Sequence, residues 1–263
     1  MVGGSACHKK ESPPIDSRER FLMSGVITAM EKSELLDPSV RTKYLENFET
    51  AIKAMISQPE FPCVGAKSAL ARDNLKVIAG HSLGSGWDDL EIHRQLLSWA
   101  REYRDSDDGL RSLAVIFDGP LDLSETEFEQ LLWARVQSLA DKDAWLGQDY
   151  DPRVSPDPAD PHFSLSFGGE AFFVIGLHPN ASRPARRFAY PMLVFNLHDQ
   201  FERLREHGTY EKMRETILAR DQKLAGDINP MLAKYGESSE ARQYSGRMVE
   251  EDWQCPFQDR RST

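Results

Sequence analysis

The sequence predicts an α+β domain with a mostly antiparallel central sheet flanked by helices. Three observations predict this class. Apolar residues recur at helical spacing through much of the first half, short apolar runs of strand length follow position 110, and a Gly-Gly dipeptide joins two of these runs. Because strands joined by tight turns pair antiparallel, we expect one sheet, with its strands concentrated after position 110, and helices packed on it.

Helical spacing predicts two amphipathic helices before position 105, one through Tyr44, Phe48, Ile52 and Met55 and one through Leu90, His93, Leu97 and Ala100. A third helix has an explicit start. Ser124 is followed three residues later by Glu127, and this capping box precedes the apolar residues Phe128, Leu131, Leu132 and Leu139. Helical spacing returns from Phe201, with a break at Gly208.

Strands are predicted at Leu113–Phe117, Phe163–Phe167, Ala171–Leu177 and Pro191–Leu197. Gly168-Gly169 suits the positive φ angles of a hairpin turn between the second and third of these. Asp149–Pro161 carries four prolines and four aspartates, so it is expected to be an irregular connection and is the candidate linker. The tail beyond Ile228 has few apolar residues and is expected to be irregular.

Composition limits the class of protein. With 263 residues, a single domain at 17–263 after a disordered tail at 1–16 is expected. No apolar run is long enough to cross a membrane and the N-terminus lacks a secretory signal, so we expect a cytoplasmic protein. Three scattered cysteines are typical of reduced thiols, and the net charge of −10 argues against nucleic-acid or anionic-membrane partners.

Common catalytic fingerprints, such as phosphate-binding loops, dinucleotide-binding motifs, zinc-protease motifs and nucleophile elbows, do not occur in the sequence. The loop Gly80–Gly86 is the nearest imitation of a phosphate loop. Ser85 is expected to cap the helix that follows, and the loop either binds an anion or is simply flexible. His93 falls on the apolar side of its helix, which favours a hydrogen-bonded core histidine.

The densest group of chemically active residues is Gly176–Phe188. His178 follows an apolar strand, and the arginines come within nine residues of it: Arg183, Arg186 and Arg187. Because arginine binds carboxylates bidentately and imidazole ligates iron, haem with its two propionates would satisfy both halves of the segment. A solvated basic loop with a structural histidine is the alternative.

Other candidates lie outside that segment. His198, beside Asp199 and Glu202, is expected either to orient a substrate and relay protons or to serve only at the helix entry. Cys63 follows a proline in an extended stretch, where a cysteine is usually a small buried hydrophobe but could offer a thiolate to a soft metal. Aromatic residues around Cys255 indicate that the C-terminal tail docks on the domain.

Long ordered blocks in this chain resemble the YqcI/YcgG family. They are FPCVGAKSA at 61–69, GLHPxxSRxxRRF at 176–188, VFNLHDQFERLR at 194–205, DINPMLxxYGExSEARQYSG at 227–246 and WQCPF at 253–257. Several bacterial members of this family are haem proteins that hydroxylate the guanidino nitrogen of arginine or related amino acids in antibiotic and toxin biosynthesis, including an enzyme of the D-cycloserine pathway. The resemblance implies a haem b cofactor and an N-hydroxylase that uses O₂, with a possible redox partner, or peroxide.

Residue roles implied by this resemblance place His178 as the proximal haem ligand, with Cys63 as the minority alternative. Arg183 and Arg187 would neutralise the propionates, and His198 would be catalytic. The guanidinium of the substrate would pair with a carboxylate, for which the candidates are Glu237 and Glu240. The α-carboxylate of the substrate would pair with an arginine, for which the candidates are Arg242 and Arg247.

Two other functions stay open at this point. One is a non-haem metal oxidase or hydrolase that uses His178, His198 and a carboxylate. The other is a noncatalytic protein that binds haem or a small ligand.

Overall fold

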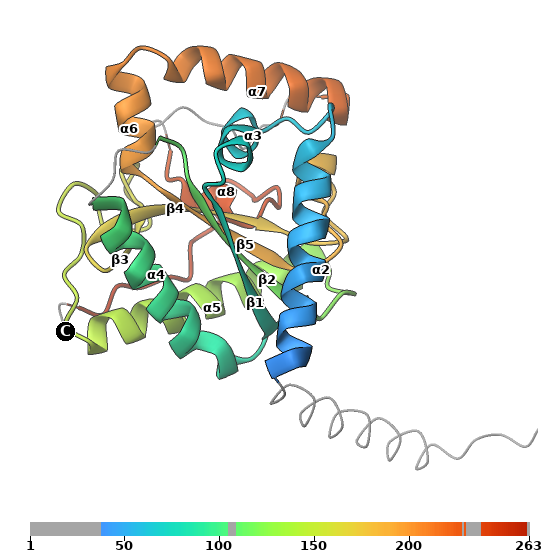
Figure 1. Cartoon of the computed structure of the whole chain (residues 1–263). Helices are drawn as coiled ribbons and strands as arrows, with labels where there is room; N and C mark the ends of the chain where they lie inside the picture. The colour runs from blue at the N-terminus through green and yellow to red at the C-terminus, as the bar shows by residue number, and fades with distance from the viewer. Residues whose placement is uncertain (1–37, 105–108, 228, 230–237, 262–263) are drawn as a thin grey trace, which may run out of the picture. The chain divides into compact units, whose positions relative to one another are not determined.

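The computed structural model describes residues 38–104, 109–227, 229 and 238–261 (Figure 1). Its contacts divide the chain into two units, Met1–Thr42 and Lys43–Thr263. The sheet, the cavity and all described helices except the first turn of α2 belong to the second unit. The tail predicted at 1–16 lies outside the described residues.

In the described part of the chain, five strands form one mixed sheet in the order β1-β2-β5-β4-β3. Their bounds are Leu75–Ser82 for β1, Ser112–Gly119 for β2, Leu165–Phe167 for β3, Glu170–Leu177 for β4 and Met192–Leu197 for β5. β1 runs parallel to β2, and the remaining neighbours are antiparallel. The prediction of an α+β domain with a mostly antiparallel sheet is confirmed.

Strand β1 corrects one expectation, because it precedes position 110. It pairs with β2 from Leu75↔Ser112 to Ser82↔Gly119. Two parallel neighbours need a crossover connection, and helix α4 supplies it. Because β1 lies at the edge of the sheet, only its middle residues, Ile78, Ala79 and Gly80, are buried. Its continuous apolar run is short, so its sequence carries a weak strand signal.

The helices in the described part of the chain are α2 (Pro38–Ser57), α3 (Val64–Ala71), α4 (Asp89–Arg104), α5 (Glu125–Trp145), α6 (Asp199–Glu206), α7 (Tyr210–Ala225) and α8 (Ala241–Tyr244). The predicted helices correspond to α2, α4, α5, α6 and α7. The capping box is present: Ser124 Oγ accepts from Glu127 N, and Glu127 accepts from Ser124 N. None of the described helices is both long and apolar enough to span a bilayer.

The predicted hairpin joins β3 and β4 through Gly168 and Gly169, whose φ angles are +61° and +78°. Two consecutive residues with positive φ are what a two-residue hairpin turn requires. A side chain at Gly168 would also collide with Leu97 of α4, since an added Cβ would lie 2.8 Å from its side chain.

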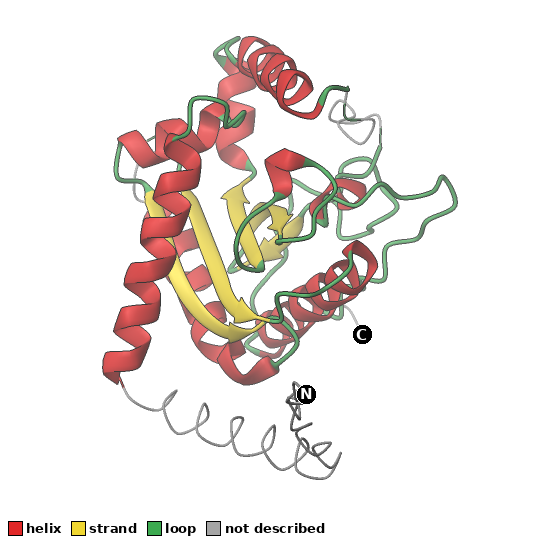
Figure 2. Cartoon of the chain, turned by 90° about the vertical axis from the view of Figure 1, so that its right-hand side faces the viewer, coloured by secondary structure: helices red, strands yellow, loops and turns green. Residues whose placement is uncertain are grey.

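Core residues occupy both faces of the sheet, as alternation along the central strands requires. On β2, Leu113 and Val115 pack in the cluster with α4, α5 and the C-terminal tail. Ala114 and Ile116 pack in the cluster that includes Phe48 and other residues of α2. Figure 2 shows helices on both sides of the twisted strands. The sheet is therefore enclosed, and it supplies a floor on which a site can be built.

The Pro- and Asp-rich segment Asp149–Pro161 is irregular, as expected, but it packs on the hairpin instead of separating two domains. Tyr150 Oη donates to Ser164 O at 2.5 Å, and Asp151 N donates to Ser166 Oγ at 2.9 Å. Ala171 N in turn donates to the Asp151 carboxylate at 2.8 Å. These bonds tie the segment to both strands of the hairpin.

Candidate functional site

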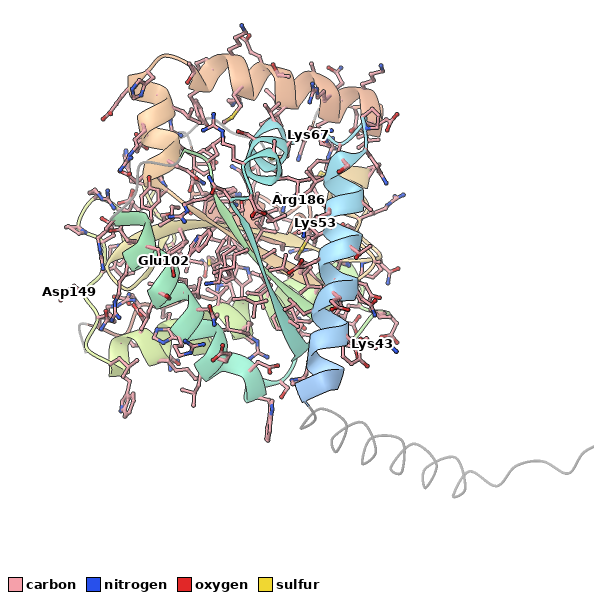
Figure 3. All side chains as sticks on the ribbon, in the orientation of Figure 1. Lys43, Lys53, Lys67, Glu102, Asp149 and Arg186 are labelled. Atoms are coloured by element: carbon pink, nitrogen blue, oxygen red, sulfur yellow. The ribbon has the colours of Figure 1, made fainter. Side chains whose placement is uncertain are left out.

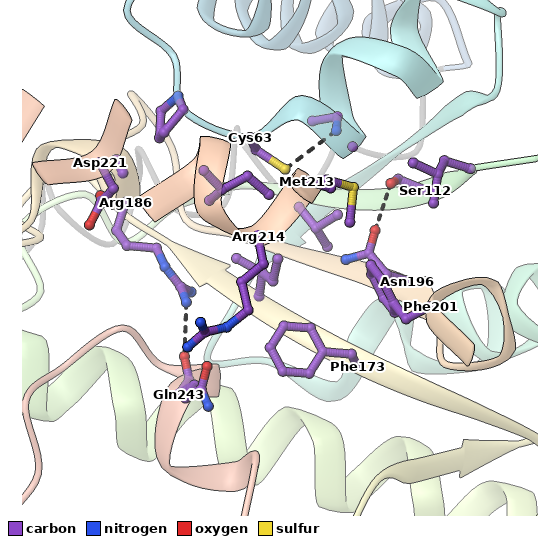
Figure 4. A pocket seen from close by; sticks show the side chains of 18 of the residues that line it. Cys63, Ser112, Phe173, Arg186, Asn196, Phe201, Met213, Arg214, Asp221 and Gln243 are labelled. Carbon is purple, nitrogen blue, oxygen red and sulfur yellow. Dashed lines mark hydrogen bonds between the residues drawn. The ribbon is translucent and has the colours of Figure 1, made fainter. Parts of the chain in front are cut away.

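A cavity of about 280 Å³ opens on the face of the sheet that α2, α3, α6 and α7 cover (Figure 4). Its volume is close to the lower end of the range for small-molecule sites, about 300 to 1,000 Å³. Strands β4 and β5 form the floor with Phe173, Ile175 and Val194, and α7 contributes Met213 and Ile217. Most of this lining is apolar, so each polar group in it is a candidate for ligand recognition.

Two polar side chains on the floor are already bonded to each other. Ser112 Oγ donates to Asn196 Oδ1 at 2.6 Å, and the pair is buried. The amide nitrogen of Asn196 can donate to a ligand on a floor that is mostly apolar.

Two arginines line one end of the cavity. Figure 3 places Arg186 well inside the outline of the protein, while Asp149 lies at its edge. Arg186 donates to Gly176 O and Gln243 O, both at 3.0 Å, and burial lowers its pKa to about 10. Figure 4 shows Arg214 directed from α7 toward the end of the cavity where Arg186 and Gln243 lie. Because arginine keeps its charge, this end attracts anions.

Cys63 lies at the start of α3 and lines the cavity. The sequence suggested an extended position. The structure adds a capping role, because Sγ accepts from Ala66 N at 3.3 Å. Burial raises the pKa of the thiol, and backbone hydrogen bonds and the charge of Arg186 act in the opposite direction. The free thiol is therefore protonated at neutral pH, although its surroundings favour the thiolate once a cation compensates for burial.

His198 and Glu240 line the cavity together. His198 follows β5, its Nε2 lies 3.0 Å from Glu202 Oε1, and its Nδ1 lies 4.0 Å from Glu240 Oε2. Burial lowers the pKa of His198. Burial also raises the pKa of Glu240, to about 8. At neutral pH the cavity therefore presents a neutral imidazole beside a neutral carboxylic acid.

His178 is not among the residues that line the cavity, although its chain neighbour Leu177 is. Its ring stacks on Phe128 with centroids 4.3 Å apart and planes at 18°. Burial lowers its pKa, and its buried Nδ1 has no hydrogen-bond partner among the described residues. In this geometry the imidazole is a packing element between β4 and α5.

The strand register separates His178 from His198. Leu177 pairs with Met192 and Phe172 with Leu197, so the two histidines follow opposite ends of the β4–β5 pair. Six residues of strand at about 3.3 Å each put them ~20 Å apart. They cannot share a metal ion. Among the described residues, no group of three or more His, Cys, Asp or Glu side chains could hold one.

The predicted propionate ligands already have protein partners. Arg183 lines the cavity and donates to Asp221 at 2.6 Å and Asp227 at 2.9 Å. Arg187 donates to Ala181 O at 2.7 Å and to Ser182 O at 2.8 Å, which closes the loop after His178.

Arg242 belongs to the docked tail. Its guanidinium donates to three tail carbonyls, Glu250, Glu251 and Trp253. Arg247 pairs with Glu129 at 2.8 Å. Glu237 lies outside the described residues.

The cavity thus unites four predicted site residues: Cys63, Arg183, His198 and Glu240. It does not include His178, Arg187 or Arg242. Sequence reasoning missed Arg205 and Arg214, which belong to amphipathic helices where charged residues are ordinary. No spacing in the sequence distinguishes these two arginines from ordinary surface residues of a helix.

Smaller candidates have structural roles. Ser85 caps a short 3₁₀ turn before α4, as expected. His93 Nε2 lies 2.7 Å from the Asp143 carboxylate in the core, which confirms the core-histidine interpretation. Cys255 packs against the core, as the docked tail requires, and burial raises its pKa to about 12.

The model of the YqcI/YcgG family matches residues 52–258 of the chain. That span contains the whole sheet and every residue of the cavity. No curated protein and no solved structure matches the chain.

Proposed function

Because the chain belongs to the YqcI/YcgG family, we propose that it is a haem-dependent N-oxygenase that hydroxylates the guanidino nitrogen of L-arginine or of a related amino acid. The oxidant is O₂ with a reductant, or peroxide. One observation carries this proposal. The cavity combines apolar walls with a thiol, an imidazole, two arginines at one end and a carboxylic acid.

The chemistry of the side chains that line the cavity suits haem, although the cavity's volume of about 280 Å³ is small for a macrocycle. Apolar walls such as Phe173 and Ile175 match the macrocycle, and Arg186 offers positive charge to a propionate. Cys63, at a helix start with a backbone N–H on its sulfur, is the residue we assign to the iron. When bound, haem would supply the chemistry that transfers an oxygen atom to nitrogen. His178 and Arg187, which the family resemblance suggested for this role, do not line the cavity.

The remaining polar residues act on the substrate. His198 is neutral because burial lowers its pKa, so it can accept a proton from the reacting nitrogen. Glu202, bonded to Nε2 at 3.0 Å, would stabilise the imidazolium that forms. The substrate carboxylate would pair with Arg214, since Arg242 is held by the tail.

Ultraviolet–visible spectra of the ferric and ferrous–CO protein, with and without L-arginine, test the proposal. We expect a Soret band after expression with adequate haem supply, a shift on adding arginine, and the red-shifted CO band of thiolate ligation. Cys63→Ser should abolish that CO band. His178→Ala should keep the Soret band, because the His178 ring stacks on Phe128 of α5 and does not line the cavity.

A colourless protein that shows no Soret band when haem is added would disprove haem dependence. Retention of the thiolate-type CO band in Cys63→Ser would remove Cys63 from the iron. Loss of the Soret band in a folded His178→Ala would move the ligand to that histidine.

The cavity volume favours a second candidate, a noncatalytic small-molecule binding protein. About 280 Å³ suits one amino acid without a macrocycle. Calorimetry that detects arginine binding to haem-free protein, with no conversion by the haem-supplied protein, would support this candidate over the oxygenase.

A further inference from the structure

Glu240 is the one acidic side chain on the cavity wall that lacks a compensating partner among the described residues. It precedes α8 but makes no side-chain cap to that helix. Its Oε2 is buried without a hydrogen-bond partner in the described part of the chain, and His198 Nδ1, at 4.0 Å, is beyond hydrogen-bond range. Its side chain is only 13% exposed. The other cavity-lining carboxylate, Asp221, is held by Arg183.

The charges around Glu240 act in opposite directions. Arg205 attracts a carboxylate there and Glu202 repels it, but these two bind each other directly on α6. His198 is neutral because of burial. Burial therefore dominates and raises the pKa of Glu240 to about 8. Other titratable or charged groups around it and on the cavity wall are Tyr244 of α8, Arg214 and Asp221 of α7, Cys63 before α3, and Arg183 and Arg186.

We infer that Glu240 recognises the cationic end of the ligand and releases its proton to solvent when that cation binds. The inference rests on the proposed function for the class of ligand, a guanidinium or ammonium compound. The step balances: the O–H bond of the carboxylic acid breaks, its proton goes to buffer, and a carboxylate–cation pair forms. It involves no oxidant or reductant.

This exchange keeps the charge of the cavity constant. One positive charge enters with the ligand, and one proton leaves. The bound cation is therefore not buried without a compensating negative charge. The carboxylate in turn forms only when the cation is present. Neutral isosteres such as L-citrulline cannot drive the exchange, so the residue also sets specificity for the cation.

A specific pH dependence follows. Below the pKa of Glu240, each unit of decrease in pH should weaken binding of a cationic ligand about tenfold, because the proton competes with it. Above that pKa, affinity should become independent of pH. Binding of L-citrulline should vary little across the same range.

Isothermal titration calorimetry of the haem-supplied protein with L-arginine tests the inference. At pH 7, titrations in buffers of different ionisation enthalpy should give close to one proton released per arginine bound, falling toward zero above pH 9. Glu240→Gln should abolish this release, flatten the pH profile and weaken binding at least tenfold at pH 8. Glu206→Gln removes the same charge from an exposed site on α6 and should leave all three measurements unchanged.

Distinct outcomes separate this inference from the proposed function. Arginine that binds and is converted without proton release, or with the same release in Glu240→Gln, overturns the inference and leaves the oxygenase intact. Equal affinity for arginine and citrulline also overturns it. Absence of arginine binding at every pH overturns both. If circular dichroism shows that Glu240→Gln does not fold, the inference is tested by the pH dependence with which the unmodified protein binds L-arginine and L-citrulline.

Discussion

The buried carboxylates of this protein differ in whether an arginine side chain binds them. Asp143 is fully buried and accepts from Arg261 at 2.6 Å. Asp89, equally buried, is held by Arg135. In both cases a guanidinium takes the place of water around the carboxylate. Glu240 has no such partner, and it keeps its proton instead.

Replacing Glu240 by Gln should therefore change how stability depends on pH. The pKa of Glu240 is raised in the folded protein, so the unfolded chain binds fewer protons between about pH 4.5 and 8, and the folded state loses stability as pH rises through this window. Glu240→Gln removes that loss. Relative to the unmodified protein, the variant should gain a few kcal/mol between pH 5 and pH 8.

Urea unfolding at the two pH values measures this difference. Glu206→Gln again serves as the control and should track the unmodified protein. Parallel stability curves for Glu240→Gln and the unmodified protein would show that Glu240 ionises normally.

At the scale of elements, helix α5 is positioned by its start and by the strand beneath it. Ser124 and Glu127 exchange hydrogen bonds that fix the first turn. Farther along, Gly176 of β4 lets the helix approach closely, since an added Cβ would lie 2.7 Å from both Phe128 and Leu132. Helix α5 thereby closes the face of the sheet opposite the cavity.

Loss of the cap should be measurable. Ser124→Ala removes the acceptor for Glu127 N and should cost about 1 kcal/mol of unfolding free energy. Ser98→Ala is the control, because Ser98 lies within α4 and its hydroxyl donates to the exposed Glu102 side chain; it should change stability by less than about 0.5 kcal/mol. Chemical unfolding of both variants compares them, and equal effects would contradict a capping role.

At the scale of the whole described domain, the C-terminal tail joins parts that are distant in sequence. Phe257 is buried in the main core cluster with residues of α4, α5 and the strands. Arg261 donates to Asp143 of α5 at 2.6 Å and to Ser166 O of β3 at 2.8 Å, and it stacks on Tyr150. The C-terminal tail, whose sequence shows no helix or strand pattern, thus connects α5 to the sheet.

Arg261→Ala should destabilise the domain by about 3 kcal/mol, because it removes the guanidinium that pairs with the buried Asp143 carboxylate and leaves that carboxylate bonded to His93 and Gly168 N. Arg260→Ala removes a neighbouring exposed arginine that pairs with Asp141, and should cost less than about 1 kcal/mol. Thermal unfolding of the pair at pH 7 provides the comparison. Similar melting temperatures for the two variants would mean that the tail is dispensable.

Local sequence patterns predicted most of this fold. They did not predict the cavity, because its residues come from segments that are distant in sequence. Helical spacing and the Gly168-Gly169 turn need only neighbouring residues, so those elements were predictable. The edge strand β1 was not, because its continuous apolar run, Val77–Ala79, is only three residues long. The cavity combines residues from distant segments such as Cys63 and Arg214, which no local spacing reveals. The conspicuous cluster after Gly176 supplies mainly structural bonds, since Arg187 closes its own loop.

The position of β5 has a consequence for how the chain is made. The central strand of the sheet is the last to be synthesised, and it lies between β2 and β4. Ser112 and Asn196, bonded across the β2–β5 pair, are 84 residues apart in sequence. During translation, the β1–β2 pair and the β3–β4 hairpin each present an unpaired edge until Met192–Leu197 leaves the ribosome. A nascent chain halted before residue 192 would therefore expose two strand edges with unpaired backbone groups. It would also lack the cavity, so the chain can bind a ligand only after its sheet is complete.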